Sequence, residues 1–347
     1  MFELTKRQEQ LLHAIQKHPG LQNNELHKQF QEHTRLTLIR DLNELVEQGL
    51  IERKGAGRSV RYFEILGSPL LKAFSLNSYF RKDLDERTPG KLSFRFEVFD
   101  ELNNLFTKEE LKTCEQENTS FQTALKTFSP TLLKKEFERM TIELAWKSSK
   151  IEGNTYSLLE TEALLKEKIE AKKHTHEEAQ MLINHKLAFD YIRQDPKDFK
   201  KITLRKIQEL HTLLVHDLGV LTGIRKGLVA ITGTNYRPID NEFQIRDALE
   251  QMVDVIEKTK HPIEKAFIAF AMLAYIQAFE DGNKRTSRLT TNAILLAHGF
   301  CPLSFRSIEV VEYKKAMILF YEQNSLHYLK KLFLEQFSFA AGNYFQN

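Results

Sequence analysis

Cysteine is scarce in this chain, which holds two among its 347 residues, Cys114 and Cys301. Two cysteines so far apart show neither the close spacing of a zinc site nor a framework of disulfide bonds. Such sparse use of cysteine is typical of a reducing compartment. We therefore expect a cytoplasmic protein in which both thiols are ordinary packed or surface side chains.

Long hydrophobic runs and a one-sided charge are also absent. The longest apolar stretch, residues 266–276, is well short of the roughly 20 residues that cross a bilayer, and the first residues lack the apolar stretch of a signal peptide. The chain has 50 Lys and Arg against 47 Asp and Glu, a net charge of +3. That charge is too small to indicate, by itself, binding to nucleic acid or to an anionic membrane, and no membrane partner is expected.

The composition that is present belongs to an ordinary globular protein, with 41% hydrophobic and 28% charged residues. A chain of this length exceeds one typical domain and suits two or three. No period of 20 to 50 residues repeats, which argues against a solenoid. From the turn and breaker residues we predict an N-terminal domain over 1–66, a helical linker region over 67–135 and a helical domain over 136–340.

The first segment carries the pattern of three helices followed by two strands. Thr5 and Asn23 are suitable N-caps for the first two helices. A third helix is predicted over about 34–48, where apolar residues recur at three-residue steps, namely Leu36, Ile39, Leu42 and Leu45. Two alternating stretches that flank a glycine turn then predict a hairpin, 50–53 and 60–65. This arrangement resembles a winged helix-turn-helix domain.

Such a domain implies contact with DNA. The third helix would enter a major groove with Arg35 and Thr37 near its N-terminus, and the wing would contact phosphates through Lys54, Arg58 and Arg61. The segment nevertheless holds ten Lys and Arg against nine Asp and Glu, below the usual basic bias of a DNA-binding domain. A protein-interaction role, including formation of a homodimer, therefore stays open beside DNA binding.

The rest of the chain is mainly helical. Short amphipathic stretches separated by prolines fill 67–135, and an almost continuous helical pattern follows. One irregular insertion at about 227–238 predicts a short β-hairpin between helices. The fold expected for the C-terminal half is a single helical bundle with that hairpin inserted.

A sharp turn, Asp281-Gly282-Asn283, lies between two predicted helices, 266–276 and 285–297. Unpaired N–H groups at a helix start, together with the helix dipole, form a ready anion site. Arg285 and Arg288 share one helix face, where guanidinium groups can hold phosphate oxygens. Asp281 can supply a hard oxygen ligand to Mg²⁺. An ordinary helix cap beside surface arginines would show the same short pattern. The choice between that cap and an anion site therefore depends on the longer string over 277–288.

The string over 277–288 resembles the signature of the Fic/Doc (Fido) family, His-x-Phe-x-Asp/Glu-Gly-Asn-Gly/Lys-Arg-x-x-Arg. The matching residues are Phe279, Asp281, Gly282, Asn283, Lys284, Arg285 and Arg288. The resemblance extends over about 148–320, roughly half of the chain. Many family members are helical proteins that transfer AMP from ATP to hydroxyl side chains of target proteins, and Doc-like members phosphorylate a target.

The resemblance implies a Fic-type helical bundle that binds ATP and Mg²⁺. The implied roles are an anion turn at Gly282, Asn283 and Lys284, phosphate contacts by Arg285 and Arg288, and a Mg²⁺ ligand at Asp281. The hairpin would be a flap over about 229–236 that adds a strand of a target protein through Val229, Ala230, Ile231 and Thr232. Position 284 is glycine in many AMP-transferring members and lysine in Doc-like ones, so AMP and phosphate transfer both stay open.

An inhibitory pattern precedes the signature. Residues 148–154 match Ser/Thr-x-x-x-Glu-Gly/Asn, with Ser148 and Glu152 on one helix face. In family members with an N-terminal inhibitory helix, here predicted over 142–154, the glutamate pairs with the second arginine of the signature, here Arg288. The glutamate then competes with the γ-phosphate for one guanidinium.

Gln277 stands where the family has the histidine that takes the proton from the target hydroxyl. An imidazole titrates near neutrality, whereas an amide cannot act as a general base at pH 7. Three functions stay open. The chain is an autoinhibited ATP-binding protein with weak or lost transfer, an active AMP- or phosphotransferase that uses another base, or a transcription factor or scaffold without nucleotide chemistry.

Overall fold

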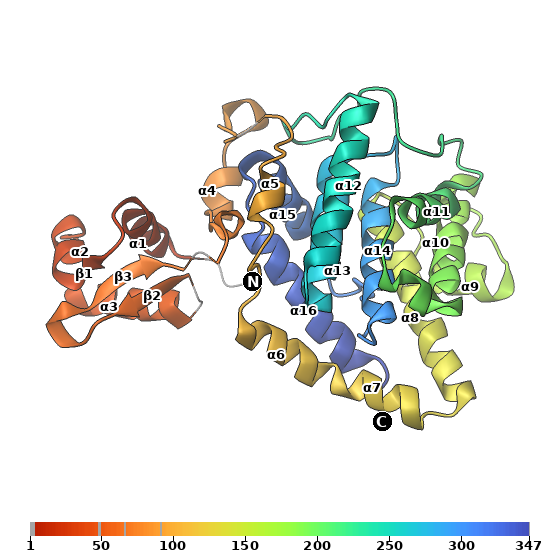
Figure 1. The fold of residues 1–347 in the computed structure, drawn as a ribbon, viewed down its shortest axis with the longest axis horizontal. Coiled ribbons are helices and arrows are strands. Elements are labelled where there is room, and N and C mark those ends of the chain that lie inside the picture. Colours follow the sequence, from red (N-terminus) through yellow and green to blue (C-terminus); the bar gives the residue numbers. More distant parts are fainter. Residues whose placement is uncertain (1–3, 48–49, 66, 91, 347) are drawn as a thin grey trace. The chain divides into compact units, whose positions relative to one another are not determined.

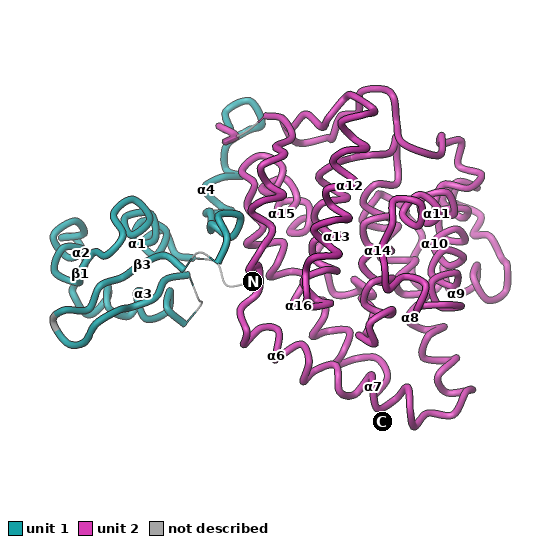
Figure 2. Tube along the Cα trace, viewed as in Figure 1, with its two compact units in different colours: residues 1–87 teal, residues 88–347 magenta. Residues whose placement is uncertain are grey.

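The computed structural model describes residues 4–47, 50–65, 67–90 and 92–346. The chain forms two compact units, Met1–Arg87 and Thr88–Asn347 (Figure 2). The first unit ends about twenty residues beyond the N-terminal domain predicted over 1–66, because residues 67–87 group with it. The predicted boundary between 135 and 136 falls inside one long helix, so it does not separate two bodies.

The first unit contains the predicted helices and hairpin (Figure 1). Its main elements are α1 Lys6–Lys17, β1 Leu21–Gln22, α2 Asn23–Gln29, α3 Arg35–Glu47, β2 Ile51–Lys54 and β3 Arg61–Glu64. Shorter helices follow at η2 Pro69–Leu71, α4 Leu76–Phe80 and η3 Leu84–Glu86. Thr5 caps α1 through a capping box, as expected. The sheet order is β1-β3-β2 with antiparallel pairs, and β1 is too short to leave an alternating pattern in the sequence.

The buried face of α3 differs from the predicted one. Leu38, Leu42 and Leu45 pack into the core, whereas Leu36 is 80% exposed. The three-residue steps drift around the helix, and spacing of four and three residues keeps side chains on one face. Leu36 therefore points away from the core, at the N-terminal end of the helix that the motif would place in a DNA groove.

The second unit is a helical bundle (Figure 1). Its helices are α5 Val98–Glu101, α6 Lys108–Glu117, α7 Thr119–Thr127, α8 Pro130–Ile151, α9 Leu158–Glu167, α10 His176–Gln194, η4 Pro196–Lys200, α11 Leu204–Val215, α12 Glu242–Lys258, α13 Pro262–Ile276, α14 Asn283–Ala297, α15 Val310–Gln323 and α16 His327–Asn343. Residues 265–276 of α13 are all buried, as befits a helix that is hydrophobic all round. Helices α12, α14 and α16 pack against it.

The flap at 229–236 has no strand among its described residues, so the expectation of a β-hairpin there is wrong. The segment is irregular, with a turn at 232–233. Glu322 of α15 accepts from Thr234 Oγ1 at 2.7 Å and from the Asn235 N–H at 3.1 Å, and within the flap the Tyr236 N–H donates to Thr234 Oγ1 at 3.1 Å. The buried Tyr236 hydroxyl donates to the Tyr275 carbonyl at 2.8 Å. These bonds hold the flap to the helical core and replace the ladder of a hairpin.

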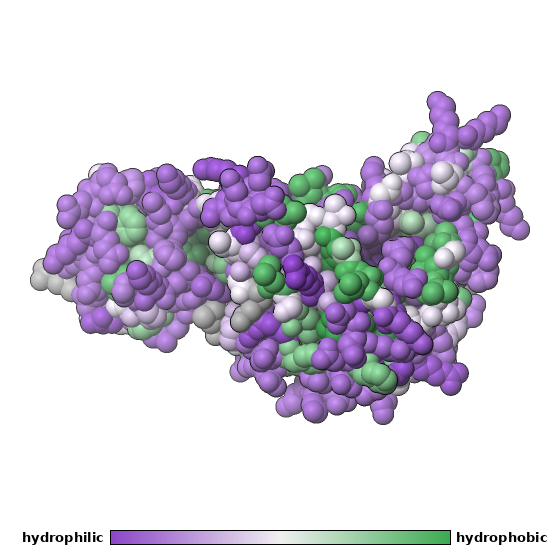
Figure 3. Space-filling model, turned by 90° about the horizontal axis from the view of Figure 1, so that it is seen from above, coloured by the Kyte–Doolittle hydropathy of each residue, from purple (hydrophilic) through white to green (hydrophobic). Residues whose placement is uncertain are grey.

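Across the described part of the chain, every helix is too short or too polar to span a bilayer. The face drawn in Figure 3 is mainly hydrophilic, with hydrophobic atoms in separate spots. Scattered apolar side chains of this kind are normal on a protein surface.

Candidate functional site

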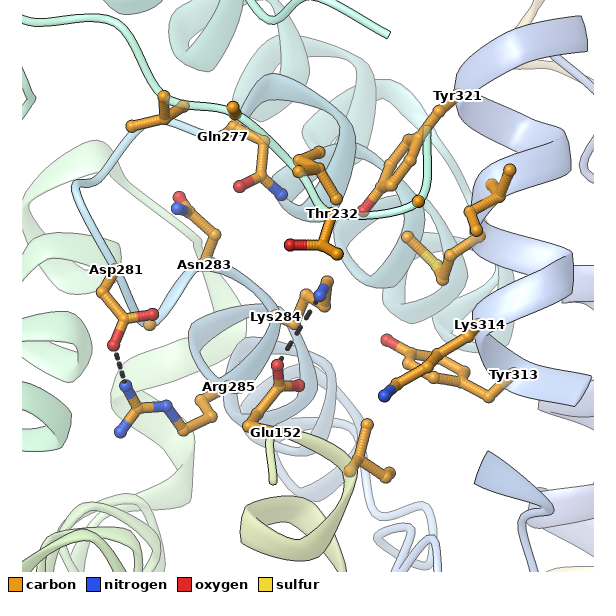
Figure 4. Close-up of a pocket in the computed structure, with 18 of the residues that line it drawn as sticks. Glu152, Thr232, Gln277, Asp281, Asn283, Lys284, Arg285, Tyr313, Lys314 and Tyr321 are labelled. Atoms are coloured by element: carbon orange, nitrogen blue, oxygen red, sulfur yellow. Dashed lines mark hydrogen bonds and ion pairs between the residues drawn. The ribbon is translucent and has the colours of Figure 1, made fainter. Parts of the chain in front are cut away.

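A cavity of about 480 Å³ lies in the second unit, beside the turn that joins α13 to α14 (Figure 4). Its walls come from four segments far apart in the sequence: the end of α8, the flap, residues 277–285 and one face of α15. The structure thus brings the predicted flap, anion turn and inhibitory glutamate to one cavity. Arg288 and Ser148 lie behind the wall that Glu152 forms.

The turn before α14 has a backbone that few residue types tolerate. Gly282 has φ +78°, and a Cβ atom there would lie 3.2 Å from Val215 Cγ1, so glycine relieves both strain and crowding. Gln277 also has a left-handed backbone, with φ 53°. His211 supports the turn from α11, because its Nε2–H donates to the Asp281 carbonyl at 3.0 Å and its ring stacks on Phe279.

Asn283 closes the turn with two hydrogen bonds to one residue. Its side chain donates to the Phe279 carbonyl at 2.7 Å and accepts from the Phe279 N–H at 2.9 Å. All these groups are buried. The amide therefore holds the loop against the start of α14, with the backbone N–H groups of that helix beside the cavity.

We expect Asn283→Ala to lower the free energy of unfolding of the second unit by about 3 kcal/mol, because two hydrogen bonds are lost and the buried Phe279 N–H stays unpaired. Urea unfolding followed by fluorescence of Trp146, the single tryptophan, reports on this unit. Asn103→Ala is the control, since that amide donates to the Asp100 carbonyl at 2.7 Å and accepts from Asn104 Nδ2 at 3.1 Å, and both bonds are exposed. Equal losses in both variants would contradict the role given to Asn283.

The arginines of the turn are deeply buried. Arg285 is 1% exposed and pairs with Asp281 at 2.7 Å, and burial lowers its pKa. Its Nη1 has no hydrogen-bond partner among the described residues. A buried guanidinium with an unmet donor is suited to receive an anionic oxygen.

Arg288 is fully buried and is engaged by α8. Its Nε donates to Ser148 Oγ at 2.8 Å, and its Nη2 donates to the Ser148 carbonyl at 3.0 Å and to Glu152 Oε1 at 2.8 Å. Burial opposes the charge of Arg288, but the nearby Glu152 outweighs burial and raises its pKa. The geometry is the pairing expected between Ser148, Glu152 and Arg288.

Lys284 contacts the same carboxylate. Its Nζ lies 3.6 Å from Glu152 Oε2, the oxygen that Arg288 does not bond (Figure 4). Burial would raise the pKa of Glu152, but Arg288 and Lys284 outweigh burial and lower it. Glu152 is therefore an anion held between two cations of α14, Lys284 and Arg288.

Gln277 lies at the C-terminal end of α13 and lines the cavity. Its side chain is 7% exposed, and its Nε2 donates to the Ala274 carbonyl at 2.6 Å. Arg225, which sequence reasoning missed, donates to the Gln277 carbonyl at 2.6 Å and to the Gly227 carbonyl at 2.5 Å. That guanidinium ties the start of the flap segment to position 277.

No histidine lines the cavity within the described ranges. The phenols in its wall are poor substitutes for a base, because burial raises the pKa of Tyr313 to about 12 and that of Tyr321 well above its ordinary value. Burial lowers the pKa of His211 to about 4, and its bonded Nε2 faces the Asp281 carbonyl. None of these groups takes the place of a neutral imidazole beside Gln277.

Helix α15 forms a wall that sequence reasoning did not identify. Its cavity-lining residues recur at helical spacing and are Tyr313, Lys314, Met317, Ile318 and Tyr321. The spacing was readable as one helix face, but nothing in the local sequence says that this face meets the phosphate turn.

Two exposed carboxylates of the turn, Glu280 and Asp281, line the cavity and could meet a divalent cation. Asp281 is 64% exposed and paired with Arg285, and the described residues contain no group of three metal-ligating side chains. Mg²⁺ commonly uses one or two carboxylates with substrate phosphates and water. The residues present therefore fit Mg²⁺ that arrives with a nucleotide better than a resident ion.

The predicted DNA contacts of the first unit are on its surface where they are described. Arg35 and Lys54 are exposed, Arg35 bonds Asn24, and Lys54 pairs with Glu52 at 2.7 Å. Thr37 bonds Thr34, and Arg61 donates to the Gly20 carbonyl at 2.8 Å. The side chain of Arg58 lies outside what the structure describes.

Comparisons with known proteins give a match within each unit. The model of the Fic/DOC family matches residues 201–295, and that of a DeoR-like helix-turn-helix domain matches residues 7–60. The chain is 28% identical over 158 residues to protein adenylyltransferase fic-1 of Caenorhabditis elegans. The aligned region covers 44% of this chain and 31% of that protein. It is 29% identical over 156 residues to protein adenylyltransferase Fic of Drosophila melanogaster, covering 44% and 32%.

These matches span about a third of the length of the curated relatives. Among solved structures, Fic-1 (aa134–508) from C. elegans has a TM-score of 0.56 and 22% identity, and covers 68% of this chain and 70% of that chain. A likeness at this identity concerns the fold.

Proposed function

We propose that this chain, which is similar to Fic-family proteins and has an N-terminal helix-turn-helix domain, binds ATP in the cavity beside residues 277–288 and is autoinhibited by Glu152. The observation that carries the proposal is the carboxylate of Glu152 between Arg288 at 2.8 Å and Lys284 at 3.6 Å. A carboxylate held by two cations marks the place where another anion would bind.

The arrangement supports a division of roles within the cavity. The N–H groups at the start of α14 and the guanidinium of Arg285 favour phosphate oxygens. Met317 and Ile318 offer apolar surface for a base. Asp281 would hold Mg²⁺, which would neutralise part of the phosphate charge when it is bound.

The flap is proposed as the docking site of a protein target. Val229, Ala230, Ile231 and Thr232 line the cavity and are not paired in a sheet. A backbone without a partner strand, held to the core by Glu322, suits strand addition by an extended segment of the target. A target hydroxyl docked there would lie near Gln277.

Transfer is proposed to be weak or lost, because Gln277 cannot accept the proton that the target hydroxyl releases. The alternative is an active AMP- or phosphotransferase in which another group takes that proton. Both AMP and phosphate transfer stay open, because the ammonium group of Lys284 adds a positive charge beside the polyphosphate and can change its orientation. The relatives named adenylyltransferases favour AMP as the group transferred.

The experiment is calorimetric titration of the wild-type and Glu152→Gly chains with ATP and Mg²⁺. Binding that grows tighter without the glutamate supports both parts of the proposal. No binding by either chain would contradict the nucleotide site and favour a regulator or scaffold without nucleotide chemistry.

DNA binding is the second function, proposed for the first unit on the match to a DeoR-like helix-turn-helix domain. The exposed N-terminal end of α3, with Arg35 and Leu36, supports it, because recognition helices contact bases near that end. Homodimer formation is the alternative role of this unit. We also infer a cytoplasmic location, since both cysteines are buried free thiols.

We expect Arg35→Ala to weaken binding to a duplex selected from random DNA by about tenfold, as the loss of one base contact of 1–3 kcal/mol. Gel-shift titration at fixed salt measures the affinity. Lys17→Ala is the control, because Lys17 is exposed at the far end of α1. No shift by the wild-type chain at low salt would instead favour dimerisation, which sedimentation would report.

A further inference from the structure

The positive side chains on the motif side of the cavity all have acidic partners. Lys284 lies 3.6 Å from Glu152, Arg285 lies 2.7 Å from Asp281, and Arg288 lies 2.8 Å from Glu152. Lys284 and Arg288 share Glu152, so an incoming polyphosphate must displace that carboxylate before it gains their full charge, whereas Arg285 keeps one unbonded Nη1 beside its pair with Asp281.

The opposite wall carries a cation in a different state. Lys314 of α15 lines the same cavity and is exposed, and no described acidic side chain forms an ion pair with it. Figure 4 shows its amino group directed into the cavity, on the side of Glu152 and Tyr313. Its neighbour Lys315 pairs with Glu312 at 3.0 Å and is not part of the cavity wall.

We propose that Lys314 is a further nucleotide-binding residue, which contacts phosphate oxygens of ATP from the wall opposite the signature. This inference rests on the proposed ATP site. An unpaired ammonium on a flexible side chain can meet a phosphate without breaking an ion pair. Lys314 therefore adds charge to the site both with Glu152 in place and after Glu152 has been removed.

Lys314 supplies positive charge on the side of the cavity that the cations of the signature do not reach. The cations of the turn approach a bound polyphosphate from α14 only, so oxygens on its other side would face α15. Of the cavity-lining residues that the structure describes on α15, Lys314 is the one with a positive charge. Cations of α14 and of α15 would then hold the same polyphosphate from two sides.

The test uses the Glu152→Gly chain, with Lys314→Met and, as matched control, Lys315→Met. Calorimetry with ATP and Mg²⁺ gives the affinity, and competition by inorganic tripolyphosphate and by adenosine separates the phosphate contact from the base contact. We expect Lys314→Met to weaken ATP and tripolyphosphate binding about tenfold and adenosine binding less than twofold. Lys315→Met should change each affinity less than twofold, and Lys314→Arg should retain most of the ATP affinity.

The outcomes separate this inference from the proposed function. If the Glu152→Gly chain binds no ATP, the nucleotide site itself is refuted and the Lys314 contact with it. If that chain binds ATP, and Lys314→Met binds ATP and tripolyphosphate as tightly as its parent does, the Lys314 contact alone is refuted. The melting temperature of the Lys314→Met variant should match that of its parent, because Lys314 is exposed.

Discussion

Replacing Glu152 with glycine will tighten ATP binding by about 10- to 100-fold. The carboxylate holds Arg288 through a charge-assisted hydrogen bond of 2.8 Å and lies 3.6 Å from Lys284. Each such bond to a charged group is worth about 1.5–3 kcal/mol, and about 1.4 kcal/mol is a tenfold change in affinity. Without Glu152 the nucleotide no longer competes for these two cations.

Calorimetry on the wild-type, Glu152→Gly and Glu152→Gln chains measures the change. The glutamine variant keeps the shape but loses the charge, so we expect an intermediate affinity. Glu167→Gly is the control, because Glu167 is an exposed acid at the end of α9. If ATP binds the wild-type and Glu152→Gly chains equally well, Glu152 is a structural partner of Arg288 and does not inhibit.

A second substitution, Gln277→His in the Glu152→Gly chain, will raise transfer to a protein by about 10²- to 10⁴-fold, the usual contribution of a general base. The backbone of Gln277 has φ 53°, and histidine is among the residues that adopt this region more readily. The side chain lines the cavity beside the flap. An imidazole there would be placed to take the proton of a docked hydroxyl.

Transfer is followed with ATP labelled on the α- or the γ-phosphate, and the label that stays on protein distinguishes AMP from phosphate transfer. Gln277→Ala in the same background is the control and should not gain activity. Strong transfer with Gln277 retained would overturn the proposal of a disabled enzyme. It would favour the active transferase that uses another base.

The residues of the candidate site were predictable to different degrees. The string over 277–288 is contiguous, so local spacing was enough to place Gly282, Asn283 and Arg285 around one turn. Glu152 and Arg288 are 136 positions apart, and only resemblance to a family could join them. Lys314, Met317 and Tyr321 were not identified as site residues, because the sequence of a helix does not show which distant segment packs against each of its faces.

Two local patterns misled in instructive ways. Three-residue steps in α3 suggested that Leu36 is buried, but helical geometry keeps Leu38, Leu42 and Leu45 on the core face. At the flap the composition suited a hairpin. There Glu322 of α15 takes the hydrogen bonds of Thr234 and Asn235, which a second strand would otherwise need.

The sequence by itself determined the helical class, the helix-turn-helix pattern, the anion turn and the absence of a histidine at position 277. Each of these features depends on a short stretch of sequence, because backbone preference and side-chain spacing act over a few residues. Only the tertiary structure decided that Lys284 also contacts Glu152, and that α15 faces the turn with Lys314. The physical reason is that burial and charge pairing join distant segments, and those energies depend on distances that no local pattern contains.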